Sequence, residues 1–312
     1  MMFKTLFVML SVAGYVSAQL TQSDHSHLKK LARDKISHSL SKGNLAGNDF
    51  ADLESLVWSS QLLELLGDKY SSEDVCKAVK KNQKGLLEGA TTVKSVFYLA
   101  ETYRLYTCEP TLKAVPEQVT SVLKKDADKM NKVANLYYAY LLNQGGKDYG
   151  QAGKIENFLA SRVRDYLLPA FNQTDFSLQG STGLSYDSLK ALEIFASVQK
   201  SPEVGKETTA LITSFIQKVN KQSVQSDSKF SYVSKEVTPV FLTKTILSIL
   251  KQSGNLDQHV SKDQKTGLRN FFVQSASLAS KPCCGVTSLK GLSFVAADIP
   301  AVRLQGDQKR TV

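Results

Sequence analysis

The sequence has 312 residues, of which 42% are hydrophobic and 22% charged. This composition is ordinary for a folded protein and excludes global disorder. The counts of 18 Gly, 7 Pro and 4 Cys exclude collagen-like, proline-rich and disulfide-dense chains. The formal charge of +10 indicates either solvated helix faces or a basic surface for an acidic partner. The lysines are dispersed, and the densest clusters are the pairs Lys29–Lys30, Lys80–Lys81 and Lys124–Lys125.

Residues 1–18 predict a cleaved signal peptide. Lys4 supplies a basic start, an apolar run begins at Leu6, and the small residues Val16-Ser17-Ala18 form a cleavage site. The apolar run is shorter than the roughly 20 residues of a membrane helix, which favours a cleaved signal over an uncleaved anchor. We therefore expect a chain in the secretory pathway that begins at Gln19 and carries a charge of +9 without Lys4. In that compartment no nucleic acid is expected as a partner.

Most of the remaining chain has the three- to four-residue apolar spacing of amphipathic helices. Asp49 is predicted as the N-cap of the first of these helices and Gly67 as its C′ residue. Glu73 and Asp74 stand in the first turn of the second helix, where the helix dipole favours acids. The predicted helices cover approximately residues 49–66, 72–79, 91–103, 115–123, 130–143, 155–168, 188–199, 203–219, 237–251 and 259–279.

Short β segments interrupt and follow the helices. Residues 175–178 and 230–233 alternate polar and apolar side chains and are predicted as hairpin insertions. The residues around Leu292 and Val302, separated by Pro300, are also β-like. We therefore expect one helical domain over residues 19–285, and over residues 286–312 the start of a truncated β-type domain.

Three residue pairs that contain aromatic side chains recur at intervals of 40 residues: Val57-Trp58, Phe97-Tyr98 and Tyr137-Tyr138. Each pair lies in the middle of a predicted helix, and another helix follows before the next pair. Helix pairs at this period predict a mainly α fold, an α/α superhelix or toroid of stacked helical hairpins with a short β-type segment at the C-terminus. The alternative is chance, because helical proteins often place large side chains in the middle of helices. Most of the tyrosines are assigned to the core, and a concave surface is the second interpretation.

The cysteines are interpreted first as disulfides, because the secretory compartment is oxidising. Cys76 falls in the second predicted helix and Cys108 just after the third, 32 positions later. Neighbouring antiparallel helices would bring them together, and we expect a disulfide between them. A ring between the adjacent Cys283 and Cys284 would be strained, so each is either free or bonded elsewhere.

The sequence offers no catalytic or metal-binding pattern. It has no nucleophile elbow, P-loop, dinucleotide fingerprint or zinc-protease motif. The acids fall at helix starts and on charged faces, where capping and solvation account for them. We expect no catalytic residue, no metal and no cofactor. An α/α-toroid enzyme would need paired acids or metal ligands that no pattern marks.

One modification signal is specific. Asn172-Gln173-Thr174 is an N-glycosylation acceptor sequence in a predicted loop. In a translocated chain Asn172 is therefore the predicted glycosylation site, and an unmodified polar loop is the alternative.

Several segments together resemble a known family. They are residues 52–59, Val75-Cys76-Lys77, residues 93–100, Thr107-Cys108-Glu109 and residues 136–139, with a valine-rich segment at 295–302. In order and character they are similar to the N-terminal lumenal region of the ribophorin II family, a subunit family of the eukaryotic oligosaccharyltransferase. The likeness extends over about residues 19–304 and is strongest over residues 49–109.

This resemblance implies an α/α superhelical lumenal domain in the endoplasmic reticulum. It implies a non-catalytic accessory role beside the subunit that transfers the oligosaccharide to asparagine. The implied partners are the other oligosaccharyltransferase subunits, with membrane association through them or through a missing C-terminal region. The alternative function is that of a secreted helical protein that binds acidic glycans or lipid through a basic surface.

Overall fold

The computed structural model of the protein describes residues 22–108, 117, 121–123, 132–145, 152–181, 183–226 and 229–279. The predicted signal peptide (1–18), Cys283–Cys284 and the β-type segment at 286–312 lie outside the described residues.

The described chain is mainly helical, as predicted. Its helices are α2 (Gln22–Ser41), α3 (Gly47–Leu65), α4 (Ser72–Lys81), α5 (Gln83–Gly89), α6 (Val93–Tyr106), α8 (Val133–Gly145), α9 (Ala152–Arg162), α10 (Tyr186–Ser197), α11 (Gly205–Asn220), α12 (Pro239–Gln252), α13 (Leu256–His259) and α14 (Lys262–Ala279), and the π-helical turn η3 (Val163–Leu167) follows α9.

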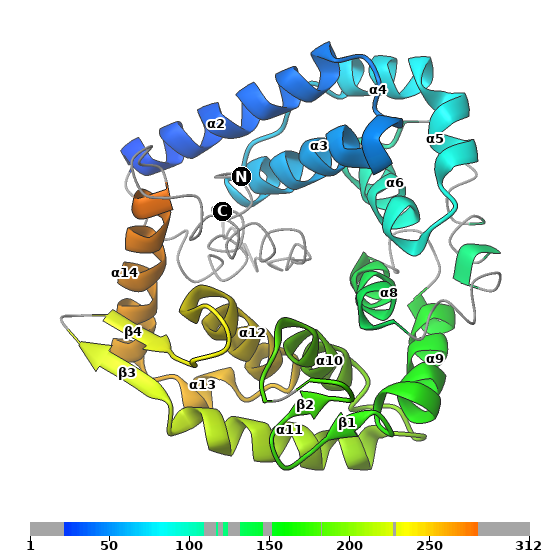
Figure 1. The fold of residues 1–312 in the computed structure, drawn as a ribbon. Coiled ribbons are helices and arrows are strands. Elements are labelled where there is room, and N and C mark those ends of the chain that lie inside the picture. Colours follow the sequence, from blue (N-terminus) through cyan, green and yellow to red (C-terminus); the bar gives the residue numbers. More distant parts are fainter. Residues whose placement is uncertain are drawn as a thin grey trace, which may run out of the picture.

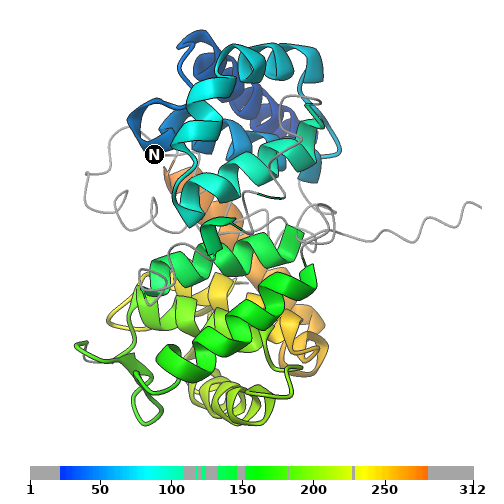
Figure 2. The same cartoon turned by 90° about the vertical axis from the view of Figure 1, so that its right-hand side faces the viewer.

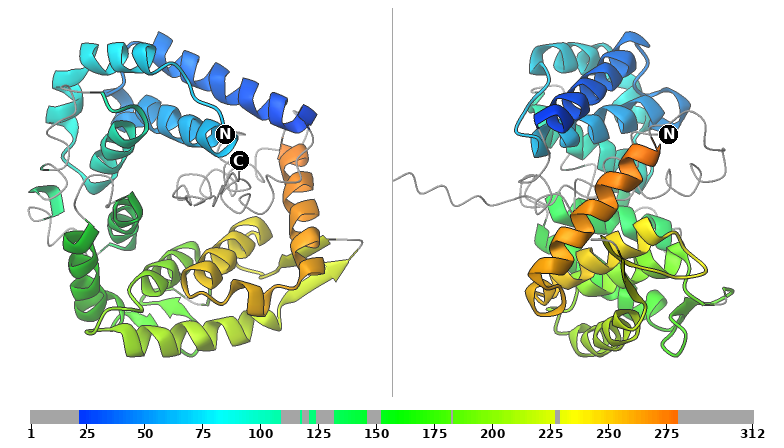
Figure 3. Two further views of the ribbon diagram at one scale, coloured as in Figure 1. Left: turned by 180° about the vertical axis from the view of Figure 1, so that it is seen from behind. Right: turned by 90° about the vertical axis from the view of Figure 1, so that its left-hand side faces the viewer.

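The helices form an inner and an outer layer that curve into a ring (Figure 1). In the inner layer α3 packs on α6, α6 on α8, α8 on α10 and α10 on α12. In the outer layer α2 covers α3, α4 covers α6, α9 covers α8 and α11 covers α10. From α8 to α12 the chain alternates between the inner and the outer layer, so that α8–α9 and α10–α11 each form one helical hairpin of the stack, as α2–α3 does at the start. Figure 2 shows the same ring from its side, with the first hairpins at one end and the later ones at the other. Seen from behind, the outer helix α14 approaches one end of α2 (Figure 3).

The inner helices are buried on nearly all sides. In α12, every residue from Val240 to Leu247 is buried, and in α6 every residue from Ser95 to Thr102 is. A helix that is covered all round belongs to the interior of a protein. The polar residues of these helices are therefore buried as well, and burial without a partner would be costly.

The helix ends follow local capping rules, with one difference from expectation. Gly67 has a φ of +67° and ends α3, as predicted. Asp49, however, is not the N-cap: α3 begins at Gly47 after Ala46, which makes no side-chain cap. Asp49 stands in the first turn, and its Oδ2 accepts a hydrogen bond from Lys94 Nζ at 3.2 Å. The carboxylate is thus bonded to the neighbouring inner helix rather than to its own.

The last predicted helix, residues 259–279, corresponds to α14, which begins at Lys262; His259 instead ends the short helix α13. The Ser261 side chain accepts the Gln264 backbone N–H, and the Gln264 side chain accepts the Ser261 backbone N–H. This reciprocal capping box fixes the start of α14, and the apolar pattern of the sequence did not reveal it.

Two short hairpins connect helices in the later part of the ring. Strands β1 (Phe171–Asn172) and β2 (Ser177–Leu178) pair antiparallel, and so do β3 (Ser223–Ser226) and β4 (Lys229–Tyr232). Both predicted strand segments thus lie in hairpins. β4 packs against α12 and α14. At Gly267 the backbone of α14 comes so near that a Cβ atom would lie 2.7 Å from the Phe230 amide nitrogen.

Candidate functional site: contacts between the inner helices, the disulfide and Asn172

The 40-residue aromatic register forms a continuous row across three inner helices. Trp58 of α3 lies 6.1 Å from Tyr98 of α6, measured between ring centroids, and Tyr98 lies 6.0 Å from Tyr138 of α8. Phe97 contacts both Trp58 and Tyr138, at 6.0 and 5.8 Å. The edge-on arrangement of Tyr98 against both neighbours is favourable for aromatic rings. Residues 40 positions apart therefore occupy equivalent places in successive hairpins.

The tyrosines of this region belong mainly to the core. Tyr98, Tyr106, Tyr137 and Tyr140 are buried, and Tyr103 and Tyr138 are partly buried. The Tyr98 and Tyr138 hydroxyls are 3.3 Å apart. Burial raises the pKa of the Tyr98 phenol well above its usual range. The Tyr98 phenol is thus an uncharged contact between helices.

A polar network joins α3 to α6 beside this row. Gln61 Nε2 donates to Glu101 Oε2 at 2.6 Å, and Arg104 Nε donates to the same oxygen at 3.0 Å. The guanidinium of Arg104 also donates two bonds to Glu64, at 3.2 and 3.1 Å. Gln61 and Glu101, like Glu64 and Arg104, are 40 positions apart, so polar side chains follow the same register as the aromatic ones. The two carboxylates outweigh burial and raise the pKa of Arg104, whose charge is therefore permanent.

A second network joins α8, α10 and α12. Lys244 Nζ lies 2.7 Å from Glu193 Oε1, and Tyr137 Oη donates to Glu193 Oε2 at 2.5 Å. Lys244 Nζ also donates to Tyr137 Oη at 3.1 Å. All three residues are no more than 2% exposed. An ionised pair so deeply buried is tolerated only where each charge has close partners. Here α8 supplies Tyr137, α10 supplies Glu193 and α12 supplies Lys244.

These networks hold helices together. Glu101 and Glu193 are buried, and each accepts a hydrogen bond from a side chain of a neighbouring helix, whereas Glu64 is exposed. The sequence did not identify Glu193 or Lys244 as important. The one signal was a lysine inside the apolar run of residues 237–250, because a charged residue among buried positions requires a partner.

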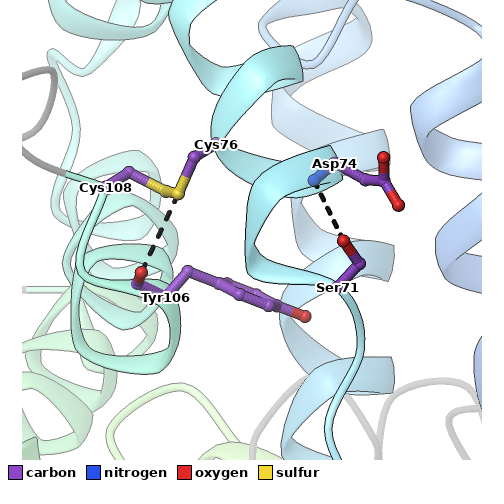
Figure 4. The surroundings of a disulfide bond; sticks show 5 residues. All are labelled: Ser71, Asp74, Cys76, Tyr106 and Cys108. Atoms are coloured by element: carbon purple, nitrogen blue, oxygen red, sulfur yellow. Dashed lines mark hydrogen bonds between the residues drawn. A yellow bond between two sulfur atoms is a disulfide. The ribbon is translucent and has the colours of Figure 1, made fainter.

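The predicted disulfide between Cys76 and Cys108 is present, and its two Cα atoms are 5.2 Å apart (Figure 4). Cys76 lies in α4, and Cys108 follows Thr107, which ends α6 in the left-handed conformation with a φ of +50°. The Tyr106 hydroxyl, on the preceding turn, hydrogen-bonds the Ser60 hydroxyl of α3. The disulfide therefore fastens the outer helix α4 to the end of the inner helix α6.

Asn172 lies exposed on the β1–β2 hairpin, with Gln173 and Thr174 exposed beside it. Its Oδ1 accepts the Thr174 backbone N–H at 2.9 Å. On either side the hairpin is anchored by buried rings: Phe171 packs edge-on against Phe195, and Phe176 against Phe215. The acceptor sequence is thus held away from the core on a fixed turn.

The described residues contain no group of three or more His, Cys, Asp or Glu side chains placed to hold a metal ion. Within the same residues, no helix combines the length and apolar character needed to cross a bilayer.

The fold and these contacts define a helical protein of stacked inner and outer helices, held together by buried aromatic and ionic contacts and by the Cys76–Cys108 disulfide. The model of the ribophorin II N-terminal domain matches residues 20–284, and the chain therefore belongs to the ribophorin II family. This family forms part of the oligosaccharyltransferase, which carries out protein N-glycosylation in the endoplasmic reticulum. No curated protein and no solved structure matches the chain.

Proposed function

We propose that this protein is a non-catalytic accessory subunit of the oligosaccharyltransferase in the lumen of the endoplasmic reticulum. The family match over residues 20–284 carries this proposal. On this view the helical ring is a scaffold that packs against the other subunits.

The pairing of the buried charges supports a structural role. Glu193 pairs with Lys244, and Glu101 pairs with Arg104, which also pairs with the exposed Glu64. A general acid or base must reach the reacting atoms, whereas these groups are bonded to one another between helices. Catalysis is therefore assigned to another subunit of the complex.

The domain limits and the modification site complete the proposal. Residues 1–18 act as the signal peptide, residues 19–285 form the helical lumenal domain, and residues 286–312 begin a β-type domain. Asn172 carries an N-linked glycan, and the exposure of its hairpin supports this because an attached glycan would displace no core residue.

The test is an affinity purification of the tagged full chain from digitonin-solubilised microsomes, with the recovered proteins identified by mass spectrometry. We expect the other oligosaccharyltransferase subunits in stoichiometric amounts, and underglycosylated secretory proteins in cells that lack the chain. Secretion of the chain into the medium with no subunit recovered would contradict the proposal. In that case, retention on heparin above physiological salt would favour a secreted protein that binds acidic glycans.

A further inference from the structure

The hairpin of β3 and β4 is a sheet of two strands, so each strand has one edge that faces away from the other. The Gln222 carbonyl accepts the Val233 backbone N–H at 3.2 Å, which makes these residues a hydrogen-bonded pair at the open end of the hairpin. In an antiparallel ladder, bonded pairs alternate with non-bonded pairs. The register therefore makes Ser223 and Gln225 the non-bonded positions of β3. Their backbone N–H and C=O groups point away from β4.

The corresponding edge of β4 is covered by two helices. Tyr232 and Phe230 are the non-bonded positions of this strand. The Tyr232 N–H donates to Thr243 Oγ1 of α12 at 2.9 Å. At Gly267 the backbone of α14 comes so close that a Cβ atom there would lie 2.7 Å from the Phe230 nitrogen. The hairpin lies beside α14 at the margin of the ring (Figure 1). No further strand can therefore add to β4.

The edge of β3 is open. In the part of the chain that the structure describes, the sheet has no strand beyond β3, and β3 packs extensively only on β4. Val224 is 45% exposed, one of two large apolar side chains exposed among the described residues. The strand contains no proline and no charged residue, with which proteins commonly protect an open edge. The Ser223 hydroxyl donates to the Asn220 carbonyl at 3.0 Å and fixes the start of the strand.

We propose that the open edge of β3 binds an extended segment of an unfolded polypeptide by strand addition. An antiparallel segment would exchange two backbone hydrogen bonds with Ser223 and two with Gln225. The residue between the two bonded positions would stand opposite Val224, where close contact of side chains favours an apolar residue. The remaining recognition is by main chain, so segments of many sequences fit.

The size of the edge favours this occupant over a folded one. Stable interfaces between folded proteins bury about 1,200–2,000 Å², far more than one strand of four residues provides. A short extended segment needs only the edge and leaves it readily. This inference rests on the proposed function, in which secretory polypeptides come to the complex for N-glycosylation. A site that recognises main chain suits acceptor polypeptides of unrelated sequence.

The test is the binding of a labelled nonapeptide of alternating threonine and valine to the purified full chain, measured by fluorescence anisotropy. The matched probe is the same peptide with every amide N-methylated, so that it keeps its side chains but donates no backbone hydrogen bond. We expect the unmethylated peptide to bind and to slow amide hydrogen exchange at residues 223–226. The methylated peptide should bind about tenfold more weakly or less.

Two variants test the edge itself. Gln225→Pro removes an N–H that points away from β4, so the ladder keeps its bonds. Val224→Lys places a charge beside the edge. Gln217→Lys adds the same charge on the exposed face of α11 and is the control. We expect about tenfold weaker binding for each edge variant and wild-type binding for the control. Melting temperatures check folding, and if Gln225→Pro unfolds, the two probes on the wild type decide.

Equal binding of the two probes, or equal binding by the wild type and Val224→Lys, overturns strand addition. Dimerisation of the wild type that Val224→Lys abolishes would assign the edge to a second copy instead. Loss of another subunit from the microsomal purification with Gln225→Pro would assign it to a stable partner, which also overturns the inference. A wild-type chain that binds the peptide but recovers no oligosaccharyltransferase subunit contradicts the proposed function and leaves the peptide site standing.

Discussion

Lys244 of α12 and Glu193 of α10 form an ion pair of 2.7 Å in the interior, and Tyr137 of α8 completes it by bonding to both. Three inner helices from distant parts of the sequence thus meet at one pair of charges. Removal of one partner would leave the other charge buried and unpaired, which is among the costliest changes in a protein core.

We therefore expect Glu193→Gln to lower the free energy of unfolding by about 3–5 kcal/mol. The measurement is chemical denaturation followed by circular dichroism. The double variant Glu193→Leu/Lys244→Met should lose less stability, because it leaves neither charge unpaired in the core. Glu203→Gln is the control, since its pair with Arg164 is exposed to solvent and contributes little to stability. A Glu193→Gln protein as stable as the wild type would refute this account of the pair.

The contact between α14 and β4 predicts a second effect. A Cβ atom at Gly267 would lie 2.7 Å from the Phe230 amide nitrogen, and backbone cannot rotate away. We expect Gly267→Ala to destabilise the protein by about 1–3 kcal/mol. Gly153→Ala in α9 is the matched control, because nothing lies within 4 Å of its Cβ position. Alanine there should be neutral or stabilising by up to about 1 kcal/mol. The measurement is the melting temperature of both variants. Equal melting temperatures would contradict the close approach of α14 to β4 at Gly267.

The disulfide predicts a loss of stability on its removal. The bond closes a span of 32 positions, which corresponds to roughly 3–4 kcal/mol in the chain-entropy model. Cys76→Ser/Cys108→Ser should therefore unfold at lower denaturant concentration than the wild type. Thiol alkylation under non-reducing conditions checks the bond directly: the wild type should protect both cysteines, and labelling of both without reductant would show that the bond does not form.

Two buried tyrosines predict a stability change at alkaline pH. Burial raises the pKa of Tyr106, and that of Tyr232, to about 12, above the ordinary value of 10.0. The folded state then retains protons that the unfolded state releases, so the stabilisation is complete below pH 10 and is lost as the pH rises toward 12.

The pKa values of these two phenols are measured from the phenolate absorbance during a pH titration of the folded protein. Tyr106→Phe and Tyr232→Phe should each remove one late-titrating phenol from the curve. If either variant instead loses a phenol that titrates at the ordinary value, that ring is not buried in solution.

The acceptor sequence predicts a glycoprotein. Asn172→Gln should migrate faster on a denaturing gel, and digestion of the wild type with a glycan-cleaving amidase should give the same shift. Thr174→Ser keeps the acceptor sequence and should keep the glycan, whereas Thr174→Ala should lose it. Identical migration of wild type and Asn172→Gln from microsomes would show that the site is not used.

The sequence by itself determined the helical class, the order of the hairpins and the Cys76–Cys108 bond. These follow from local information: apolar spacing, capping residues such as Gly67, and a 40-residue register that places Trp58, Tyr98 and Tyr138 at equivalent positions. In a repeat protein each unit packs against the unit that follows it in the sequence. The repeat period therefore indicates which residues of successive hairpins are in contact.

Only the tertiary structure decided which charged residues are buried and what they contact. Glu193 and Lys244 are 51 positions apart, and Tyr137 precedes Lys244 by 107. The register ends where the β1–β2 hairpin and β3–β4 enlarge the later units, so no fixed spacing links these three.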